Sequence, residues 1–424
     1  MHHFERQGGV LHAEAISLER LAAAVGTPFY CYSEATLRRH MRVFKAAFAD
    51  LDPLVAYSVK ANSNLAVLAI MREEGAGADV VSGGELYRAL EAGIQGSMIV
   101  FSGVGKTREE MAAALDAGVF QFNVESENEL EALNEVALSR SAVAPIAFRV
   151  NPDVSAGGHE KISTGKAEDK FGIAWTRARA LYARAASMKG IEIKGVDVHI
   201  GSQIADLAPF ERAFERVADL VRALRADGHP IERLDLGGGL GIPYGEPAGG
   251  GGDPPHPDDY AGLIRRIAAP LDIRLIFEPG RMIVGNAGVL VSRVLYVKEG
   301  EARKFLIVDA AMNDLIRPAL YDAYHGVEPV RLRQGEWKPY DIVGPVCETG
   351  DRFARARPLP PTKEGDLVAF MSAGAYGAAQ SSQYNSRPLI PEILVSDDQY
   401  AIIRRRPSFD AMLAGERNPE WKNA

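Results

Sequence analysis

The stretch Tyr57-Ser58-Val59-Lys60-Ala61-Asn62 decides how the rest of the chain is interpreted. Leu54 and Val55 precede it and predict a short buried strand over residues 54–59, so Lys60 stands where the chain turns toward a helix. A lysine at a strand end can reach into a site. Burial or nearby positive charge would lower its pKa and free the amine to form a Schiff base with an aldehyde. A solvated lysine in a loop is the alternative.

Outward from this stretch, strand-like and helix-like segments alternate along the chain. The predicted strands cover residues 54–59, 78–81, 98–101, 119–124, 145–150, 195–200, 233–236 and 273–277. Strands that alternate with helices are joined by right-handed crossovers into a parallel sheet, and about eight of them suit a closed barrel. We therefore predict an α/β fold with a TIM (β/α)8 barrel.

The helices between these strands carry start and stop signals. Ser33 is the predicted N-cap of a helix that ends near Phe48, and Ser126 with Glu129 forms a predicted capping box. An apolar stripe at helical spacing ends before Gly228; it consists of Phe210, Phe214, Val217, Val221 and Leu224. Such stripes indicate core packing.

After about residue 284 the pattern changes to strands without long helices between them. These strands are predicted over residues 289–297, 305–308, 340–343, 367–371 and 400–403, and an earlier one over 29–32. We predict a second, mostly β domain of sandwich-like or barrel-like form, made of residues 285–424 with a contribution from residues 1–33. The barrel domain is then residues 34–284.

Composition limits the classes of function. The 424 residues are 47% hydrophobic and 25% charged, the balance of a soluble globular protein. A net charge of −8 disfavours nucleic acid and anionic membranes as partners. The two cysteines, Cys31 and Cys347, suit a reducing compartment, and the first residues lack the apolar core of a signal peptide. The sequence therefore predicts a cytoplasmic protein.

Unusual polar residues gather where the predicted barrel strands end, which is where a barrel builds its active site. They are Lys60, Arg149, Asn151, His199, Ser202, Glu278 and Arg281, with the triplet Gly237-Gly238-Gly239. A glycine triplet lets backbone N–H groups approach an anion, and Arg281 can add a bidentate contact. A plain tight turn also collects glycine, but the position after strand seven favours a phosphate site.

Glu278 lies between Phe277 and Pro279, so we expect it to be buried and to need a partner such as a protonated ring nitrogen. His199 can stack on a flat ring or serve only as a structural hydrogen-bonding residue. Together these features predict pyridoxal 5′-phosphate as the cofactor. The lysine suits its aldehyde, the glycine turn its phosphate, and the carboxylate its pyridinium nitrogen.

The second domain supplies further candidates. Cys347 lies near Glu348 and Asp351, and an inert buried thiol is the alternative. Residues 313–321 and 373–377 carry arginine and tyrosine among glycine and proline, so we expect them to contact a ligand. The sequence has no H-E-x-x-H, paired C-x-x-C or P-loop motif, so we predict neither a metal site nor nucleotide hydrolysis.

From about residue 27 to residue 395 the chain resembles the fold-type III pyridoxal-phosphate decarboxylases, and within them the diaminopimelate decarboxylases of lysine biosynthesis. The resemblance is carried by residues 57–62, 159–165, 170–172, 199–203, 235–239, 278–281, 317–325, 347–351 and 375–377. It implies decarboxylation of meso-2,6-diaminopimelate to L-lysine by a homodimer.

The resemblance also implies roles for individual residues. Lys60 would hold the cofactor aldehyde, His199 would stack on the ring, Glu278 would pair with the ring nitrogen, and Cys347 would donate a proton. The residues implied around the phosphate are Ser202, Gly238, Gly239, Gly280, Arg281 and Tyr376. The implied substrate contacts are Arg281, Arg317, Tyr321, Glu348 and Tyr376. Cys347 and Glu348 would come from the partner subunit.

Charge separates this substrate from the nearest alternatives. A substrate with amino-acid groups at both ends needs a cation for its far carboxylate and an anion for its far ammonium, which Arg317 and Glu348 provide. Ornithine or arginine would leave Arg317 without its carboxylate and facing like charge. The alternatives are a decarboxylase of carboxynorspermidine or a basic amino acid, a Schiff-base aldolase and a non-catalytic cofactor carrier, whereas Glu278 and Cys347 disfavour an alanine racemase.

Two features depart from the family pattern. Gln380 and Gln383 stand where the family usually has methionine and asparagine, and the loop over residues 243–257, rich in glycine and proline, looks longer than typical. The contacts of both loops are left open by the sequence.

Overall fold

The computed structural model describes residues 2–154, 170–245 and 253–421. Residues 159–165, which carry part of the resemblance, and residues 246–252 of the long loop lie outside this description. The chain forms two compact units: the first is Glu34–Ala287 with Gly374–Ala379, and the second is His2–Ser33, Gly288–Ala373 and the residues from Gln380 onward.

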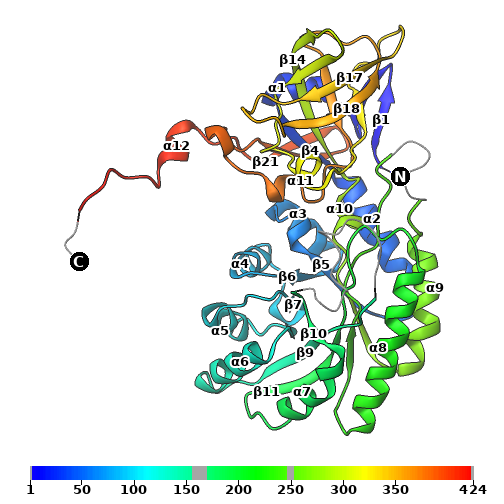
Figure 1. The fold of residues 1–424 in the computed structure, drawn as a ribbon, viewed down its shortest axis with the longest axis vertical. Helices are drawn as coiled ribbons and strands as arrows, with labels where there is room; N and C mark the ends of the chain where they lie inside the picture. The colour runs from blue at the N-terminus through cyan, green and yellow to red at the C-terminus, as the bar shows by residue number, and fades with distance from the viewer. Residues whose placement is uncertain (1, 155–169, 246–252, 422–424) are drawn as a thin grey trace. The chain divides into compact units, whose positions relative to one another are not determined.

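The first unit is a closed barrel of parallel strands (Figure 1). In order around the ring, its strands are β5 (Leu54–Ser58), β6 (Gly77–Val80), β7 (Ile99–Phe101), β8 (Gln121–Val124), β9 (Ala144–Asn151), β11 (Ile191–Asp197), β12 (Arg233–Asp235) and β13 (Arg274–Phe277). β8 pairs with β9, and β13 pairs with β5, so the ring closes. The short strand β10 (Ile173–Ala174) is added beside β9. The predicted TIM barrel is confirmed.

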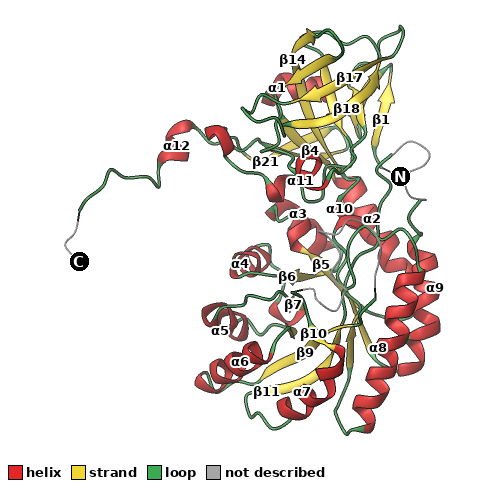
Figure 2. Cartoon of the chain, viewed as in Figure 1, coloured by secondary structure: helices red, strands yellow, loops and turns green. Residues whose placement is uncertain are grey.

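Helices, red in Figure 2, follow the strands on the outside of the barrel. They are α2 (Glu34–Ala47), α3 (Leu65–Glu73), α4 (Gly83–Glu91), α5 (Arg108–Asp116), α6 (Glu127–Ser139), α7 (Ala178–Ala185), α8 (Ala208–Ala226), α9 (Pro257–Ile267) and α10 (Arg281–Val284). The apolar stripe predicted before Gly228 lies on α8 and is buried. α2 begins directly after Ser33, the predicted N-cap.

The capping box predicted at α6 forms only in part. The Ser126 hydroxyl accepts the Glu129 N–H, as predicted. The Glu129 carboxylate, however, accepts the Glu125 N–H and the Lys106 ammonium. A buried contact with the loop that contains Lys106 therefore helps to determine the partners of the Glu129 carboxylate. The local sequence pattern around Glu129 gives no sign of this contact.

Residues that point into the barrel change from apolar to polar along the strands. Leu54, Ala56, Val100 and Ile276 pack into one apolar cluster at the N-terminal end. Ser58, two residues after Ala56 on β5, is hydrogen-bonded to Asp79 on β6. The period of two that points alternate residues inward thus also gathers polar side chains at the C-terminal end.

The second unit is mostly β-structure, as predicted. Its elements are β1 (Phe4–Gln7), β2 (Val10–Ala13), β3 (Ile16–Ser17), α1 (Leu18–Val25), β4 (Phe29–Ser33), β14 (Gly288–Glu299), β15 (Lys304–Val308), α11 (Arg317–Tyr321), β16 (Val327–Pro329), β17 (Lys338–Val343), β18 (Arg352–Leu359), β19 (Leu367–Phe370), β20 (Glu392–Ser396), β21 (Gln399–Arg404) and α12 (Phe409–Leu413). β14 pairs with β4, β15 and β19. β4, from the N-terminal part of the chain, lies between β14 and β20.

Several strands of the second unit were not expected from the sequence. β18 carries arginines at Arg352, Arg355 and Arg357, so its apolar pattern is weak, and Pro358 within it suggests a turn. It is an edge strand, and an edge tolerates proline because one side of the backbone needs no ladder partner.

None of the helices in the described ranges is long and apolar enough to cross a membrane.

Candidate active site

Lys60 lies in a short 3-10 helix, η1 (Val59–Ala61), that follows β5 directly, so the strand ends one residue earlier than predicted. Its Nζ atom is 2.6 Å from Asp79 Oδ2. The Ser58 hydroxyl donates to the same oxygen at 2.6 Å. Asp79 is fully buried, whereas 35% of the Lys60 side chain is exposed. Lys60 therefore lies at the C-terminal end of the barrel, with its ammonium group paired to the buried Asp79 carboxylate.

The expectation of a lowered pKa for Lys60 is wrong. Burial does lower this pKa, but the carboxyl groups of Asp79 and Glu278 outweigh burial and raise it. Lys60 is thus an ammonium group until a proton leaves it. Asp79, at 2.6 Å, is positioned to accept that proton.

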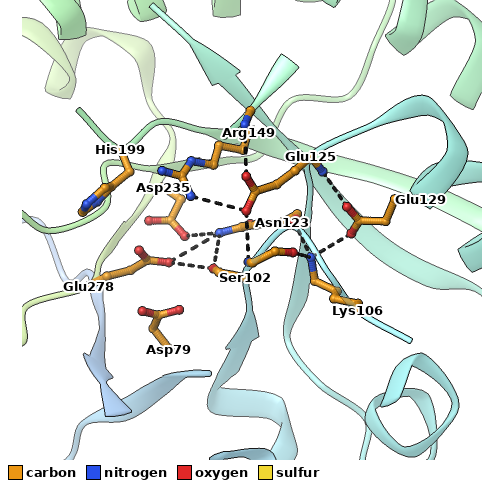
Figure 3. Close-up of polar contacts among 12 residues, drawn as sticks. Asp79, Ser102, Lys106, Asn123, Glu125, Glu129, Arg149, His199, Asp235 and Glu278 are labelled. Atoms are coloured by element: carbon orange, nitrogen blue, oxygen red, sulfur yellow. Dashed lines mark hydrogen bonds and ion pairs between the residues drawn. The ribbon is translucent and has the colours of Figure 1, made fainter. Parts of the chain in front are cut away.

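Glu278 follows β13 and is 6% exposed, which confirms its predicted burial. Its Oε1 atom accepts hydrogen bonds from Ser102 Oγ at 3.2 Å and from Asn123 Nδ2 at 3.4 Å (Figure 3). The same Asn123 amide donates to Asp235 Oδ2 at 3.1 Å. Buried acids from two strand ends are therefore joined through one amide.

Buried acidic side chains are in excess at this end of the barrel. Burial raises the pKa values of Glu278, Asp235 and Asp197, and the acids raise one another's further. One oxygen of Asp79 and one of Asp197 are buried and have no hydrogen-bond partner within the described residues. A cationic heterocycle such as a pyridinium would favour the ionised form of these acids, so the buried carboxyl groups fit the expected cofactor.

His199 lies two residues after β11, which starts four residues and ends three residues earlier than the strand predicted over residues 195–200. Its Nδ1 atom accepts the Gly238 N–H at 3.1 Å, so its proton is on Nε2. Burial, Arg149 and Lys60 all lower its pKa. His199 is therefore a neutral ring, which suits stacking on an aromatic cofactor.

The glycine turn after β12 leaves no room for side chains. A Cβ atom on Gly238 would lie 2.4 Å from the carbonyl oxygen of Glu278, and one on Gly239 would lie 2.7 Å from that of Gly201. Gly239 also has φ +111°, a conformation that favours glycine. The bare turn therefore fits the predicted anion cradle.

Arg281 begins α10 and brings the other cradle residues together. Its guanidinium donates to Ser202 Oγ at 3.0 Å and to the Tyr244 hydroxyl. The guanidinium carbon lies 4.9 Å from the centroid of the Tyr376 ring. Arg281 is thus the centre of a cluster with Ser202 and Tyr376. The cation and the hydroxyl groups of this cluster are the kind of hydrogen-bond donors that bind a phosphate.

The three segments that supply these residues are joined by backbone contacts. The Ser58 N–H donates to the Pro279 carbonyl at 3.1 Å, and the Tyr376 N–H donates to the Ala61 carbonyl at 2.8 Å. Gly280 permits the close approach, since a Cβ there would lie 2.9 Å from Ser58 Cβ. Tyr376 belongs to the segment Gly374–Ala379 of the first unit.

Two residues of this end of the barrel had no signal in the motifs. Lys106, in the loop after β7, has no exposed side-chain surface and donates to Glu129 Oε1 at 2.7 Å and to the Asn123 carbonyl at 2.8 Å. Asp79 is the other. Its inward direction could have been found from the period of two along β6, as its neighbours Ala78 and Val80 point to the opposite face.

Arg317 and Tyr321 lie at the two ends of α11 in the second unit. Arg317 is 6% exposed, and its Nη1 is 2.8 Å from His325 Nε2. His325 Nδ1 lies 2.8 Å from the Met371 carbonyl, which places the ring proton on Nδ1 and leaves Nε2 as the acceptor for Arg317. The guanidinium is therefore held in a fixed direction.

Cys347 and Glu348 lie in the loop between β17 and β18, and both are exposed. The alternative of an inert buried thiol is therefore wrong for Cys347. Asp351 is buried, and its carboxylate accepts the N–H groups of Val346 and Met312, each at 2.7 Å, so it holds the base of the loop. Gln380 and Gln383 are exposed.

Comparison with known proteins agrees with this geometry. Residues 34–285 match the family model described as pyridoxal-dependent decarboxylase, pyridoxal binding domain. The chain is 50% identical over 421 residues to diaminopimelate decarboxylase of Zymomonas mobilis subsp. mobilis, and the match covers 99% of both chains.

Two solved structures also match nearly the whole chain. Diaminopimelate decarboxylase from Helicobacter pylori, complexed with L-lysine, has a TM-score of 0.89 at 39% identity, covering 93% of this chain and 98% of that one. The M. jannaschii diaminopimelate decarboxylase, also in complex with L-lysine, has a TM-score of 0.93 at 36% identity, covering 98% of each chain. The chain belongs to the pyridoxal-dependent decarboxylases and, among them, to the diaminopimelate decarboxylase family.

Proposed function

We propose that this chain decarboxylates meso-2,6-diaminopimelate to L-lysine and CO2, the last step of lysine biosynthesis, with pyridoxal 5′-phosphate as its cofactor. The observation that carries the proposal is the arrangement of Lys60, Glu278 and the glycine turn at one end of the barrel, in a chain of this family. When bound, the cofactor withdraws electrons from the carbon that loses CO2.

Residues of the barrel would hold the cofactor at both ends. Lys60 would bind its aldehyde, and Glu278 would keep the ring nitrogen protonated. The neutral ring of His199 would stack on the cofactor. Its phosphate would lie among Ser202, Gly238, Gly239, Gly280, Arg281 and Tyr376. The excess of buried acid and the bare glycine turn support these assignments.

Asp79 would control the proton of Lys60. The ammonium must lose a proton before its nitrogen can react, and Asp79 Oδ2 is the carboxylate oxygen at 2.6 Å. Once its nitrogen is free again, Lys60 would take back a proton from the same carboxyl group. A buried acid beside Lys60 can supply both transfers without bulk water.

Residues of the second unit would recognise the far end of the substrate. Arg317 would bind the far carboxylate, and its fixed direction beside His325 supports this role. Glu348 would bind the far ammonium, with Arg281, Tyr321 and Tyr376 as further contacts. Cys347 would donate the proton that replaces CO2.

We further propose that the protein acts in the cytoplasm as a homodimer in which Cys347 and Glu348 complete the partner's site. The exposure of both residues supports this, because a residue that serves a neighbouring subunit must be accessible in the isolated chain. The alternative is a site completed within one chain.

The function is tested by CO2 release from the purified, cofactor-loaded protein. We expect turnover of meso-2,6-diaminopimelate and at least roughly 100-fold lower kcat/KM for lysine, ornithine and arginine, because each lacks the far carboxylate. Comparable rates with lysine or ornithine would instead identify a decarboxylase of basic amino acids.

Shared sites are tested by mixing two inactive variants. Lys60→Ala and Cys347→Ala homodimers each lack an essential group in both sites. If sites are shared, random exchange of subunits makes half of the dimers mixed, each with one intact site, and restores about one quarter of wild-type activity. A mixture that stays inactive after exchange, verified by mass-labelled subunits, would show that each site is built within one chain.

A further inference from the structure

The glycine turn and Glu278 lie at opposite ends of the expected cofactor, yet one buried carboxylate contacts the residues that control both. Asp235 is the last residue of β12 and is fully buried. Its Oδ1 atom accepts the Gly237 N–H at 3.0 Å. Its Oδ2 atom accepts from Asn123 Nδ2 at 3.1 Å. Each oxygen therefore serves a different part of the site.

The contact through Oδ1 sets the path of the glycine turn. Gly237 has φ +63°, and the Asp235 carboxylate fixes its N–H two residues after the strand. The turn is further constrained at Gly238, whose N–H donates to His199. Without the Asp235 acceptor, the Gly237 N–H would be buried without this partner, and the turn would be free to move.

The contact through Oδ2 sets the position of the Asn123 amide. The amide oxygen accepts from Gln121 Nε2 at 2.8 Å, so its nitrogen must face the acids. That nitrogen reaches Asp235 and Ser102, each at 3.1 Å, and Glu278 at 3.4 Å. Ser102 in turn donates to Glu278 at 3.2 Å. Asp235 thus holds the donors that orient the Glu278 carboxylate.

We propose that Asp235 is a positioning residue that couples the phosphate-binding glycine turn to the carboxylate that pairs with the ring nitrogen. The inference rests on the proposed function, since it assigns those two ends to one cofactor. A single buried group then sets the distance between the anion cradle and the acid, and so selects a ligand with both a phosphate and a ring nitrogen.

The test measures binding rather than turnover. Apoprotein is titrated with three ligands: pyridoxal 5′-phosphate, pyridoxal without the phosphate, and the phosphorylated analogue whose ring nitrogen is replaced by CH. The affinity ratio of the first to the second gives the preference for phosphate. The ratio of the first to the third gives the preference for the ring nitrogen. A variant that only weakens the fold would lower all three affinities and leave both ratios unchanged.

Four variants separate the two contacts. Asp235→Ala removes both, and we expect each preference to fall roughly tenfold. Asp235→Asn keeps an oxygen for the Gly237 N–H but turns an amide donor toward Asn123, so only the nitrogen preference should fall. Asn123→Ala should behave in the same way. Asp197→Asn is the matched control, because it replaces another buried acid, one with no hydrogen bond to Gly237 or Asn123 within the described residues, and it should leave the phosphate preference unchanged.

The outcomes distinguish this inference from the proposed function. If wild-type protein does not bind pyridoxal 5′-phosphate, the proposed function is wrong and the inference with it. If the wild type shows both preferences but Asp235→Ala changes one or neither, the coupling alone is wrong. A loss of the phosphate preference in Asp235→Asn as large as in Asp235→Ala would also overturn it.

Discussion

Replacing Lys60 with alanine should reduce decarboxylation on the order of 10³-fold or more, because the amine proposed to bind the aldehyde, which lies 2.6 Å from Asp79 Oδ2, is lost. The measurement is kcat with meso-2,6-diaminopimelate. Borohydride treatment of the loaded protein, followed by mass spectrometry, gives a second result. Wild-type protein should gain the mass of the reduced cofactor on Lys60, and Lys60→Ala should gain none.

Lys106→Met is the matched control for this experiment. Lys106 is the more deeply buried lysine at the same end of the barrel, and it is paired with Glu129. Its replacement should lower the melting temperature because Glu129 loses its partner, yet borohydride should still attach the cofactor to Lys60. Attachment in Lys60→Ala, or its loss in Lys106→Met alone, would mean that Lys106 holds the aldehyde.

Replacing Arg317 with alanine should lower kcat/KM for meso-2,6-diaminopimelate by about 100-fold, since a charge-assisted contact to the far carboxylate is lost. The affinity for pyridoxal 5′-phosphate should stay within about twofold, since the proposed cofactor contacts lie in the first unit. The two quantities are measured by steady-state CO2 release and by titration of apoprotein. The variant should also lose its preference for diaminopimelate over lysine.

Arg333→Ala controls for the loss of one positive charge from the second unit. Arg333 pairs with Asp366 at 2.6 Å and is 37% exposed. Such a surface pair contributes little to stability, so kinetics should match the wild type. Equal activity of Arg317→Ala and wild type on diaminopimelate would refute the assignment of Arg317 to the far carboxylate.

Local pattern in the sequence is sufficient for the barrel. The run before Lys60, the stripe on α8 and the regular alternation of strand and helix each follow from burial of apolar side chains at a fixed period. The same alternation predicts that strand ends meet at one edge, so Lys60, His199 and Glu278 are expected near one another from the sequence alone. Family motifs then added roles for Arg317 and Cys347.

Pattern fails where a residue's surroundings come from distant segments. The partners of Glu129 and the course of β18 were missed because a buried ammonium from another loop and an edge position in a sheet decide them. Neither the buried ammonium nor the edge position can be recognised from the residues next to it in the sequence. The hydrogen bonds of Asn123 could not be predicted for the same reason, since Asn123 has the sequence surroundings of an ordinary strand residue.

The sequence by itself determined the fold, the family and the motif residues that gather at the C-terminal end of the barrel. Only the tertiary structure decided their charge states. It places Lys60 beside Asp79 and brings Asp235 to Asn123, 112 residues away along the chain. The pKa of Lys60 is raised, against expectation, because the strength of a buried charge pair depends on distance and on exclusion of water, and neither is written in the order of residues.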